Sequence, residues 1–274
     1  MHFWKYQGAG NDFILIDQRR ERWLGREDTE EIARLCDRHF GVGADGLILL
    51  HEHPDFDFEM VYFNADGGES SMCGNGGRCI TAFAKEIGIV RERYRFLAVD
   101  GPHEAVIMTT SENETWVELR MGDVLQVEQL VPAPDFVLNT GSPHFIRFVS
   151  NLGSHDVVRE GREVRYSERF GVAGINVNLV EETPDVLRIR TYERGVEDET
   201  LACGTGVTAA VLARHVWQGR QPGIHEAAVL AVGGDLRVRY HAHADGSFSE
   251  IWLCGPAVEV FNGTISTHKD ESAG

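Results

Sequence analysis

The chain has 274 residues, of which 42% are hydrophobic and 25% are charged, a mixture typical of a globular protein with a sizeable core. Its 43 acidic residues outnumber its 26 lysines and arginines, and a formal net charge of −17 repels phosphate backbones and anionic lipid. Because the sequence also has no apolar run of membrane-spanning length and no signal-peptide pattern at residues 1–10, we expect a cytoplasmic protein that binds neither nucleic acid nor membrane.

Short strands separated by turns dominate the first half of the chain. Their apolar patterning and flanking turn residues predict strands at 3–7, 13–17, 47–51, 56–64, 94–99, 104–110 and 116–121. Asp100 and Gly101 are a hairpin signal between the fifth and sixth of these strands. Helical periodicity is confined to 28–40 and 75–87.

The proline-rich segment 131–135 lies near the midpoint and predicts the domain boundary. We expect an N-terminal domain of residues 1–130 and a C-terminal domain of residues 131–274, with residues from about 262 packing back onto the first. The second half is predicted to hold one helix, at 204–217, and strands at 175–180, 186–192, 227–232, 236–241 and 249–253. Many antiparallel strands with few helices are typical of an α+β fold.

The two halves of the chain share a motif. Residues 64–68 (NADGG) precede 72–78 (MCGNGGR), and 192–195 (YERG) precede 202–207 (ACGTGV). Each Cys-Gly-x-Gly follows a predicted strand and opens an apolar helix. We infer two halves of similar architecture, each with one cysteine at a helix N-terminus.

This placement of Cys73 and Cys203 suits acid–base chemistry. Unpaired N–H groups and the helix dipole lower the pKa of a thiol, and the glycine N–H groups suit a carboxylate. If the two motifs face each other across an interdomain cleft, one thiolate can remove a proton from a carbon while the opposite thiol delivers one. That exchange inverts the stereocentre. His144, in the turn 141–145 (GSPHF), either adjusts one of these thiols or has a structural role.

The other three cysteines are expected to be structural. Cys36 and Cys254 are interpreted as small buried hydrophobic residues, and Cys79 lies far enough into its helix to face away from the site. An odd number of cysteines with no CxxC pair argues against a disulfide framework or a zinc knuckle.

Two further patterns carry no predicted site. The segment 41–46 (GVGADG) satisfies GxGxxG, but it follows a helix and enters a strand, the wrong order for a dinucleotide fold. His51 with His53, and His241 with His243, have the spacing of metal ligands on one strand face. No third ligand accompanies either pair, so we expect these histidines to be exposed and to bind no metal.

The sequence resembles the diaminopimelate epimerase family, the pyridoxal-independent epimerases of bacterial lysine and peptidoglycan synthesis. The resemblance runs from near the first residue to about Ile265. It rests on the motifs at 8–13 (GAGNDF), 63–67 (FNADG), 73–76 (CGNG), 141–144 (GSPH), 175–176 (IN), 192–195 (YERG) and 202–206 (ACGTG). It implies two pseudosymmetric α+β domains, each a mainly antiparallel sheet wrapped around a central helix, with the active site in the cleft between them.

The resemblance also implies roles for individual residues. Cys73 and Cys203 are the acid–base pair, and His144 and Glu193 adjust the pKa values of the thiols. The helix N-termini hold the carboxylate at the reacting centre, while asparagines and Arg194 bind the distal end of the amino acid. The implied substrate contacts are Asn11, Asn64, Gly74, Asn75, Ser142, Asn176, Glu193, Arg194, Gly204 and Thr205. Ser142 stands where many members have asparagine and reaches less far.

The implied enzyme uses no cofactor and no metal, acts on a small amino acid, and forms a homodimer as members of the family often do. The nearest alternative is a proline racemase or hydroxyproline epimerase, but those enzymes usually have histidine at the position of Asn75. A cyclic imino acid would also leave Arg194 without a distal carboxylate. A broader amino-acid racemase of the same fold is the other enzymatic alternative. A thiol redox or metal-binding protein is the alternative from a different class.

Overall fold

The computed structural model describes residues 1–112, 114–131 and 134–266, and these residues pack into two compact units. The first unit comprises Met1–Leu119 together with the described residues from Pro256 onward, and the second comprises Arg120–Gly255. The predicted domain limits, 1–130 and 131–274, stay a prediction, and the packing of the described residues changes unit at 119/120 and again at 255/256.

The described residues of the first unit form eight strands, two helices and the end of a ninth strand. Its strands are β1 (His2–Gly8), β2 (Asn11–Asp17), β3 (Gly46–His51), β4 (Phe58–Asn64), β5 (Glu69–Ser70), β6 (Tyr94–Ala98), β7 (Gly101–Thr110) and β8 (Glu114–Arg120). The helices are α1 (Thr29–Cys36) and α2 (Gly74–Glu86). The predicted hairpin at Asp100-Gly101 joins β6 to β7 and is confirmed.

The second unit holds the remaining strands and helices. Its strands are β9 (Glu128–Leu130), β10 (Asp135–Asn139), β11 (Pro143–Phe148), β12 (Asn176–Glu182), β13 (Leu187–Glu193), β14 (Asp198–Thr200), β15 (Gly223–Ala231), β16 (Gly234–Ala242) and β17 (Phe248–Thr264). The helices are the 3₁₀ turn η1 (Leu152–Ser154), α3 (Val157–Arg165) and α4 (Gly204–Trp217). Strand β17 continues into the first unit, where its last residues pair with β1.

The two units repeat one strand topology. In the first, β1–β2 is antiparallel, β2–β3 parallel, β3–β4 and β4–β5 antiparallel, β4–β6 parallel and β6–β7 antiparallel. In the second, β10 to β16 pair in the same order and with the same directions. Helices α1 and α3 occupy equivalent positions in the chain, as do α2 and α4. The predicted α+β class and internal repeat are therefore confirmed.

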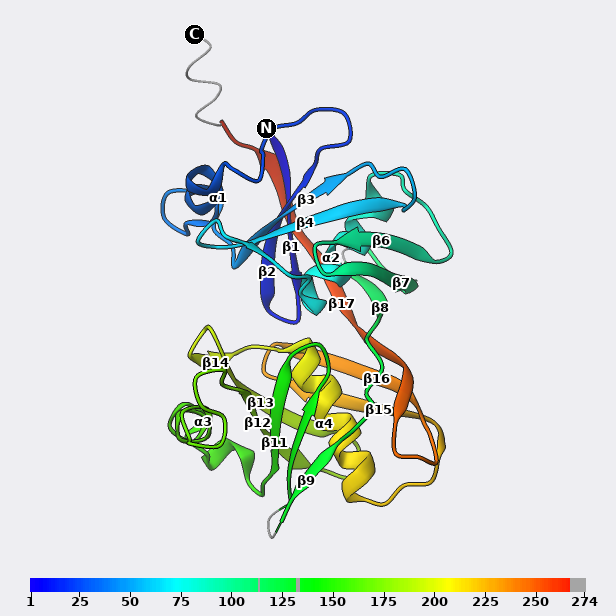
Figure 1. Ribbon diagram of the computed structural model, residues 1–274. Coiled ribbons are helices and arrows are strands. Elements are labelled where there is room, and N and C mark those ends of the chain that lie inside the picture. The colour runs from blue at the N-terminus through cyan, green and yellow to red at the C-terminus, as the bar shows by residue number, and fades with distance from the viewer. Residues whose placement is uncertain (113, 132–133, 267–274) are drawn as a thin grey trace. The chain divides into compact units, whose positions relative to one another are not determined.

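Each unit surrounds one helix with strands (Figure 1). Helix α2 contacts β1, β2, β3 and β7, and ten of its 13 residues are buried. Helix α4 contacts β10, β11, β12, β13, β15 and β16, and ten of its 14 residues are buried. The two cysteine motifs lie at the N-termini of these two enclosed helices.

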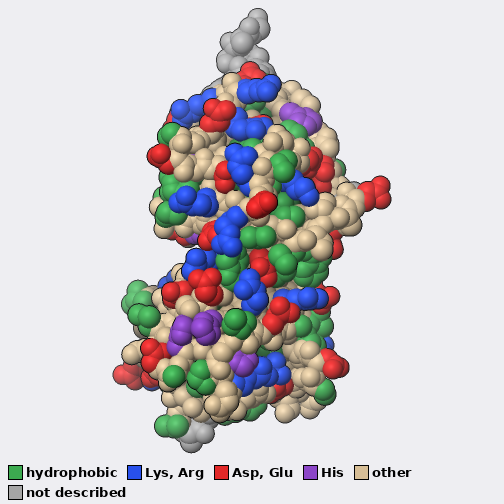
Figure 2. Space-filling view, turned by 90° about the vertical axis from the view of Figure 1, so that its right-hand side faces the viewer, with side chains coloured by type: hydrophobic (Ala, Val, Ile, Leu, Met, Phe, Trp, Pro, Cys, Tyr) green, Lys and Arg blue, Asp and Glu red, His purple; other side chains and the backbone are tan. Residues whose placement is uncertain are grey.

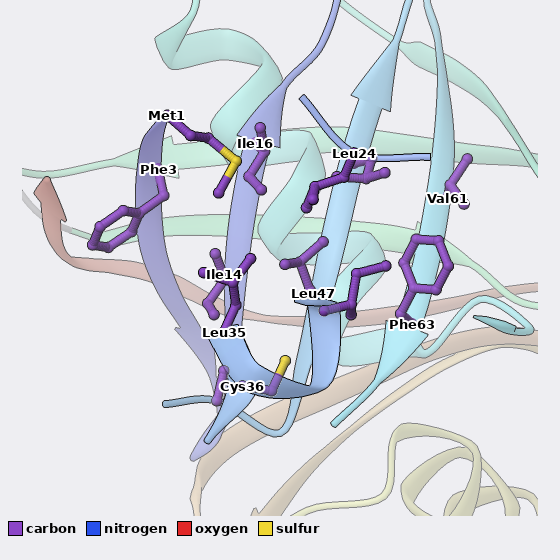
Figure 3. Packing of buried hydrophobic residues seen from close by; sticks show 13 residues of the cluster. Met1, Phe3, Ile14, Ile16, Leu24, Leu35, Cys36, Leu47, Val61 and Phe63 are labelled. Carbon is purple, nitrogen blue, oxygen red and sulfur yellow. The ribbon is translucent and has the colours of Figure 1, made fainter. Parts of the chain in front are cut away.

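An apolar cluster lies between α1 and strands β1 to β4 in the first unit, and it includes Cys36 (Figure 3). Cys36 is only 3% exposed, and burial raises its pKa to about 12. The sequence-based interpretation of this cysteine as a buried hydrophobic residue is therefore confirmed. Helix α1 ends at Cys36, short of the predicted end at residue 40, because the Asp37 carboxylate accepts from the backbone N–H groups of His39 and Phe40 and closes a turn there.

The surface of each unit mixes charges of both signs. On the face seen in Figure 2, basic residues (Lys and Arg) and acidic residues are interspersed rather than separated into patches. Ion pairs among the described residues include Arg147 with Asp135 and Arg190 with Glu199. No helix among the described residues is long and apolar enough to cross a membrane.

Candidate active site

Cys73 is the N-cap of α2, with an extended backbone (φ −91°, ψ 132°), and its carbonyl accepts from the N–H of Gly77 at 2.8 Å. The next residues, Gly74 and Asn75, form the first turn. A Cβ on Gly76 would lie 3.1 Å from Ile48 Cδ1, so this glycine lets α2 pack closely on β3. The cysteine therefore stands at the start of a helix whose N-terminal N–H groups lack partners within the helix.

Asn11 reaches Cys73 from the hairpin between β1 and β2. Gly8 pairs with Asn11 across this hairpin, and the intervening Ala9 and Gly10 have positive φ angles of 53° and 86°. Asn11 Oδ1 accepts from Cys73 Sγ at 3.6 Å. The amide nitrogen of Asn11 donates to Asp45 at 2.7 Å, which fixes the oxygen toward the thiol.

A buried arginine lies beneath the first turn of α2, and sequence reasoning missed it. Arg78 is fully buried, donates to Asn75 Oδ1 at 2.9 Å and to the Gly74 carbonyl at 3.3 Å. Asn75 in turn donates to Asn11 Oδ1 at 3.3 Å, so its side chain is occupied within the protein. The available signal is a charged residue inside an otherwise apolar helix, a pattern that indicates a bonded, non-surface arginine.

Cys203 is the N-cap of α4 and repeats the arrangement of Cys73. Its backbone is extended (φ −112°, ψ 109°), and its carbonyl accepts from the N–H of Val207 at 2.9 Å. The neighbour of its sulfur differs, because Thr205 Oγ1 lies 3.4 Å from Cys203 Sγ. A hydroxyl can either donate or accept, so Thr205 can hydrogen-bond to Cys203 both as a thiol and as a thiolate.

His144 connects β11 to this helix start. It is fully buried, and its Nε2 lies 2.8 Å from Thr205 Oγ1 while its Nδ1 lies 3.1 Å from Asn178 Nδ2. Burial, together with the charge of Arg194, lowers the pKa of His144 to about 3. The imidazole is therefore neutral at physiological pH, and one nitrogen donates while the other accepts.

Asn176 organises the turn before His144. Its amide nitrogen donates to Ser142 Oγ at 2.8 Å and to the Pro143 carbonyl at 3.1 Å, and its oxygen accepts from the N–H of Arg194 at 2.8 Å. Arg194 is exposed, and its guanidinium donates to the Ala173 carbonyl at 2.9 Å. The structure thus joins Ser142, Asn176 and Arg194 on one side of the second unit.

Glu193 precedes Arg194 at the end of β13. Burial raises the pKa of Glu193, and a hydrogen bond from Thr200 Oγ1 at 2.9 Å partly opposes that shift. The equivalent residue in the first unit, at the end of β4, is Asn64, whose side chain is exposed. Both residues directly precede the short hairpin that leads to a cysteine-bearing helix.

The remaining sequence expectations have mixed outcomes. Cys79 is fully buried and burial raises its pKa to about 12, as expected of a structural cysteine. The histidines of the two candidate metal pairs are half-buried, which corrects the expectation that they are exposed: His51, His53, His241 and His243. His243 bonds to Ser249 Oγ at 2.7 Å. Within the residues that the structure describes, no group of three or more His, Cys, Asp or Glu side chains could hold a metal ion.

Comparison with known proteins gives a match over almost the whole chain. The sequence model of the family described as diaminopimelate epimerase matches residues 3–127 and 136–259. A diaminopimelate epimerase of Flavobacterium psychrophilum is 46% identical over 266 residues, which cover 97% of this chain and all of the relative. One of Chlorobaculum tepidum is 43% identical over 262 residues, covering 94% and 99%.

Solved structures share the fold at much lower identity. The phenazine biosynthesis protein of Bacillus anthracis, of the PhzF family, has a TM-score of 0.75 at 14% identity, covering 97% of this chain and 99% of the other. A hydroxyproline epimerase from Agrobacterium vitis, with trans-4-hydroxy-L-proline bound, has a TM-score of 0.65 at 16% identity, covering 96% and 91%. At these identities the likeness concerns the fold alone.

Proposed function

The chain belongs to the diaminopimelate epimerase family, and from this we propose that it interconverts L,L- and meso-diaminopimelate with two cysteines and no cofactor. The observation that carries the proposal is the duplicated Cys-Gly-x-Gly, with Cys73 and Cys203 each the N-cap of an enclosed helix. The proposed role is in lysine and peptidoglycan precursor synthesis. The expected cytoplasmic location and homodimer stay predictions.

In the proposed mechanism both sulfurs act on one α-carbon from opposite faces. One thiolate takes the α-proton, and the thiol on the other side donates its own proton, which inverts the centre. The α-carboxylate gains negative charge as the carbanion forms. The backbone N–H groups at the starts of α2 and α4, including those of Gly74, Asn75, Gly204 and Thr205, are suited to stabilise it.

Residues around the two helix starts supply the other proposed roles. We assign the distal carboxylate to Arg194, because an arginine can bind a carboxylate in a bidentate manner. We assign the remaining distal contacts to Asn11, Asn64, Ser142, Asn176 and Glu193. Asn176 has both amide hydrogens engaged within the protein, so it serves mainly by holding Ser142 and the backbone of Arg194.

The test is chiral chromatography of L,L-diaminopimelate incubated with the purified protein, without pyridoxal phosphate and with a chelator. We expect conversion to an equilibrium mixture with the meso form. L-Proline and trans-4-hydroxy-L-proline serve as rival substrates, and L-lysine serves as an analogue without the distal carboxylate. We expect no inversion of the first two and at most slow inversion of lysine.

Three outcomes would overturn the proposal. Proline or hydroxyproline could be inverted as fast as diaminopimelate, which would favour the rival imino-acid function. Activity could require pyridoxal phosphate or disappear with the chelator. The third outcome is that the protein turns over none of the four amino acids, which would favour a redox or metal-binding role for the thiols.

A further inference from the structure

Buried polar side chains form a continuous chain behind Cys203, entirely within the second unit. Thr191 Oγ1 lies 2.9 Å from Asn178 Oδ1, and Asn178 Nδ2 lies 3.1 Å from His144 Nδ1. His144 Nε2 then lies 2.8 Å from Thr205 Oγ1, which lies 3.4 Å from Cys203 Sγ. Asn178 and His144 are 0% exposed and Thr191 is 3% exposed, so water does not substitute freely for these bonds.

The orientation of the Asn178 amide follows from its partners. Its Nδ2 lies 3.0 Å from the carbonyl oxygen of Phe145, which can only accept. The nitrogen must therefore face Phe145, and its second hydrogen points to His144 Nδ1. The amide oxygen is left for the hydroxyl of Thr191, which donates to it.

The amide orientation in turn decides the tautomer of His144. Nδ1 accepts from Asn178, so a neutral imidazole carries its proton on Nε2. That N–H donates to Thr205 Oγ1. The hydroxyl hydrogen of Thr205 is then directed away from His144 and is available to Cys203 Sγ. Hydrogen bonds to a charged group are stronger than those between neutral groups, so a thiolate gains more from this donor than a thiol does.

We propose that Asn178 is a positioning residue: it holds His144 as the Nε2–H tautomer so that the Thr205 hydroxyl donates to Cys203 and stabilises its thiolate. The inference rests on the proposed function in taking Cys203 as one of the two bases. No bond to carbon or sulfur forms or breaks in this device. It sets only the direction in which three hydrogen bonds point.

The packing of α4 on β12 supports the same assignment. A Cβ on Gly206 would lie 2.4 Å from Asn178 Oδ1 and 3.2 Å from His144 Cε1. The glycine of the second Cys-Gly-x-Gly thus leaves room for these two side chains. In the first unit the equivalent glycine faces the apolar Ile48 instead, so this polar chain belongs to the Cys203 side alone.

The charged groups around His144 do not decide which of its ring nitrogens carries the proton; the hydrogen bond from Asn178 does. Arg194 is the charged group that acts on the pKa of His144, and it favours the neutral imidazole. Glu193 holds a hydrogen bond from Thr200. Several charged side chains on the surrounding strands and on α4 form ion pairs: Arg147 with Asp135, Arg188 with Glu181, Arg190 with Glu199, Arg214 with Glu182 and Arg237 with Glu226.

The first test is ¹⁵N NMR of His144 in the full-length protein. We expect an unprotonated Nδ1 and a protonated Nε2, with no titration between pH 5 and pH 9. In Asn178→Asp, a carboxylate replaces the donor, so Nδ1 must become protonated. A proton on Nδ1 in the parent protein, or an unchanged tautomer in the variant, would overturn the inference.

The second test is the alkylation of Cys203 by iodoacetamide, resolved by peptide mass spectrometry. At a pH where the variant imidazole is neutral, its Nε2 accepts from Thr205 and removes the donor from Cys203. We expect alkylation of Cys203 in Asn178→Asp to require a higher pH and to be roughly tenfold slower near pH 7. The Cys73 peptide in the same samples should be unchanged, and Asn151→Asp, at an exposed position in the same unit, is the matched control.

Variants of Thr205 keep the test decisive if Asn178→Asp does not fold. Thr205→Val removes the hydroxyl and should slow alkylation of Cys203 to a similar extent, whereas Thr205→Ser should restore it. Equal Cys203 profiles in the valine and serine variants would overturn the inference. If the parent protein epimerises diaminopimelate but Cys203 ignores these substitutions, the inference fails and the proposed function stands. If the substitutions slow the alkylation of Cys203 but the parent protein does not epimerise diaminopimelate, the hydrogen-bond inference stands and the proposed function fails.

Discussion

The two cysteine-bearing helix starts repeat one backbone but surround their sulfurs with different chemistry. Cys73 donates to the amide oxygen of Asn11, an acceptor only, so that contact requires the thiol proton. Cys203 lies beside the hydroxyl of Thr205, which can donate. The repeated backbone accounts for the shared helix N-terminus, and the unlike side chains give the two sulfurs different hydrogen-bond partners.

The buried groups behind the two sulfurs differ in the same way. Behind the first lies a cation, the guanidinium of Arg78, which holds Asn75 and the carbonyl of Gly74. Behind the second lies the neutral His144, held by Asn178. The residue between the glycines is Asn75 in one motif and Thr205 in the other. Each bonds to a different buried side chain, Asn75 to Arg78 and Thr205 to His144.

The largest expected effect comes from removing either sulfur. Cys73→Ala and Cys203→Ala should each lower epimerisation by at least ~10²–10⁴-fold, because inversion needs both a base and an opposing acid. Each variant should still eliminate a β-leaving group from one stereoisomer, and the two should prefer opposite stereoisomers. Cys79→Ala, at the fully buried neighbour, is the control and should stay within a few-fold of the parent.

Steady-state epimerisation and elimination rates on these three variants decide the matter. If Cys73→Ala retains substantial epimerisation, or if both alanine variants eliminate from the same stereoisomer, the two sulfurs do not act on opposite faces.

Substitution of Arg194 tests its proposed role in binding the distal carboxylate of the substrate. Arg194→Lys should raise KM for diaminopimelate by roughly 10–100-fold with a smaller change in kcat, because it loses one bidentate contact remote from the chemistry. Initial rates over a range of substrate concentrations measure this. The matched control is Arg188→Lys, on β13, the strand that ends just before Arg194; Arg188 is in an exposed ion pair with Glu181, and its substitution should leave KM unchanged. An unchanged KM in Arg194→Lys would remove Arg194 from the binding site.

The glycines at equivalent positions of the two motifs should respond differently to alanine. In Gly206→Ala the new Cβ would lie 2.4 Å from Asn178 Oδ1, a side chain held in a buried network. We expect a loss of ~1–3 kcal/mol in the free energy of unfolding. In Gly76→Ala the nearest atom is the end of the Ile48 side chain at 3.1 Å, and alanine favours a helix by up to ~1 kcal/mol.

Urea denaturation of both variants measures these effects. Gly76→Ala should leave the free energy of unfolding almost unchanged, because the helix preference of alanine offsets its close contact with Ile48, and it is the control for Gly206→Ala. Equal destabilisation of the two would contradict the difference in packing behind the two sulfurs.

The smallest effect concerns the pH dependence of stability at Glu193. Burial raises the pKa of this carboxyl above its unfolded value, so the folded protein favours the protonated form. Its contribution to stability is full below the unfolded pKa and is lost as the pH rises through the folded pKa. Glu193→Gln should therefore be slightly more stable than the parent at pH 7, with the difference shrinking below about pH 4. A difference that grows on acidification would have the wrong sign.

The sequence predicted the repeat and both cysteine sites because their signals are local. Glycine, cysteine and the apolar helix that follows are contiguous, so the pattern alone locates α2 and α4. It missed β10, which lies within the proline- and turn-rich segment 131–143, and the short strand β11, which begins at Pro143 where that segment ends. It also missed α3, whose exposed charged residues weaken the apolar pattern. Partnerships between elements were also beyond reach: Arg78 with Pro256 depends on how α2 packs against β17, and Asn178 with Thr191 depends on the pairing of β12 with β13.

The central claim is that two sulfurs exchange protons with one carbon from opposite sides, and deuterium incorporation tests it most directly. L,L-Diaminopimelate is incubated with the protein in D₂O and sampled after a small fraction has reacted. Because the donating thiol has exchanged with solvent, we predict that nearly every meso product molecule carries deuterium at the inverted centre while the remaining L,L substrate carries almost none. Meso product that retains the substrate's own proton, or substrate labelled as fast as product, would contradict the account.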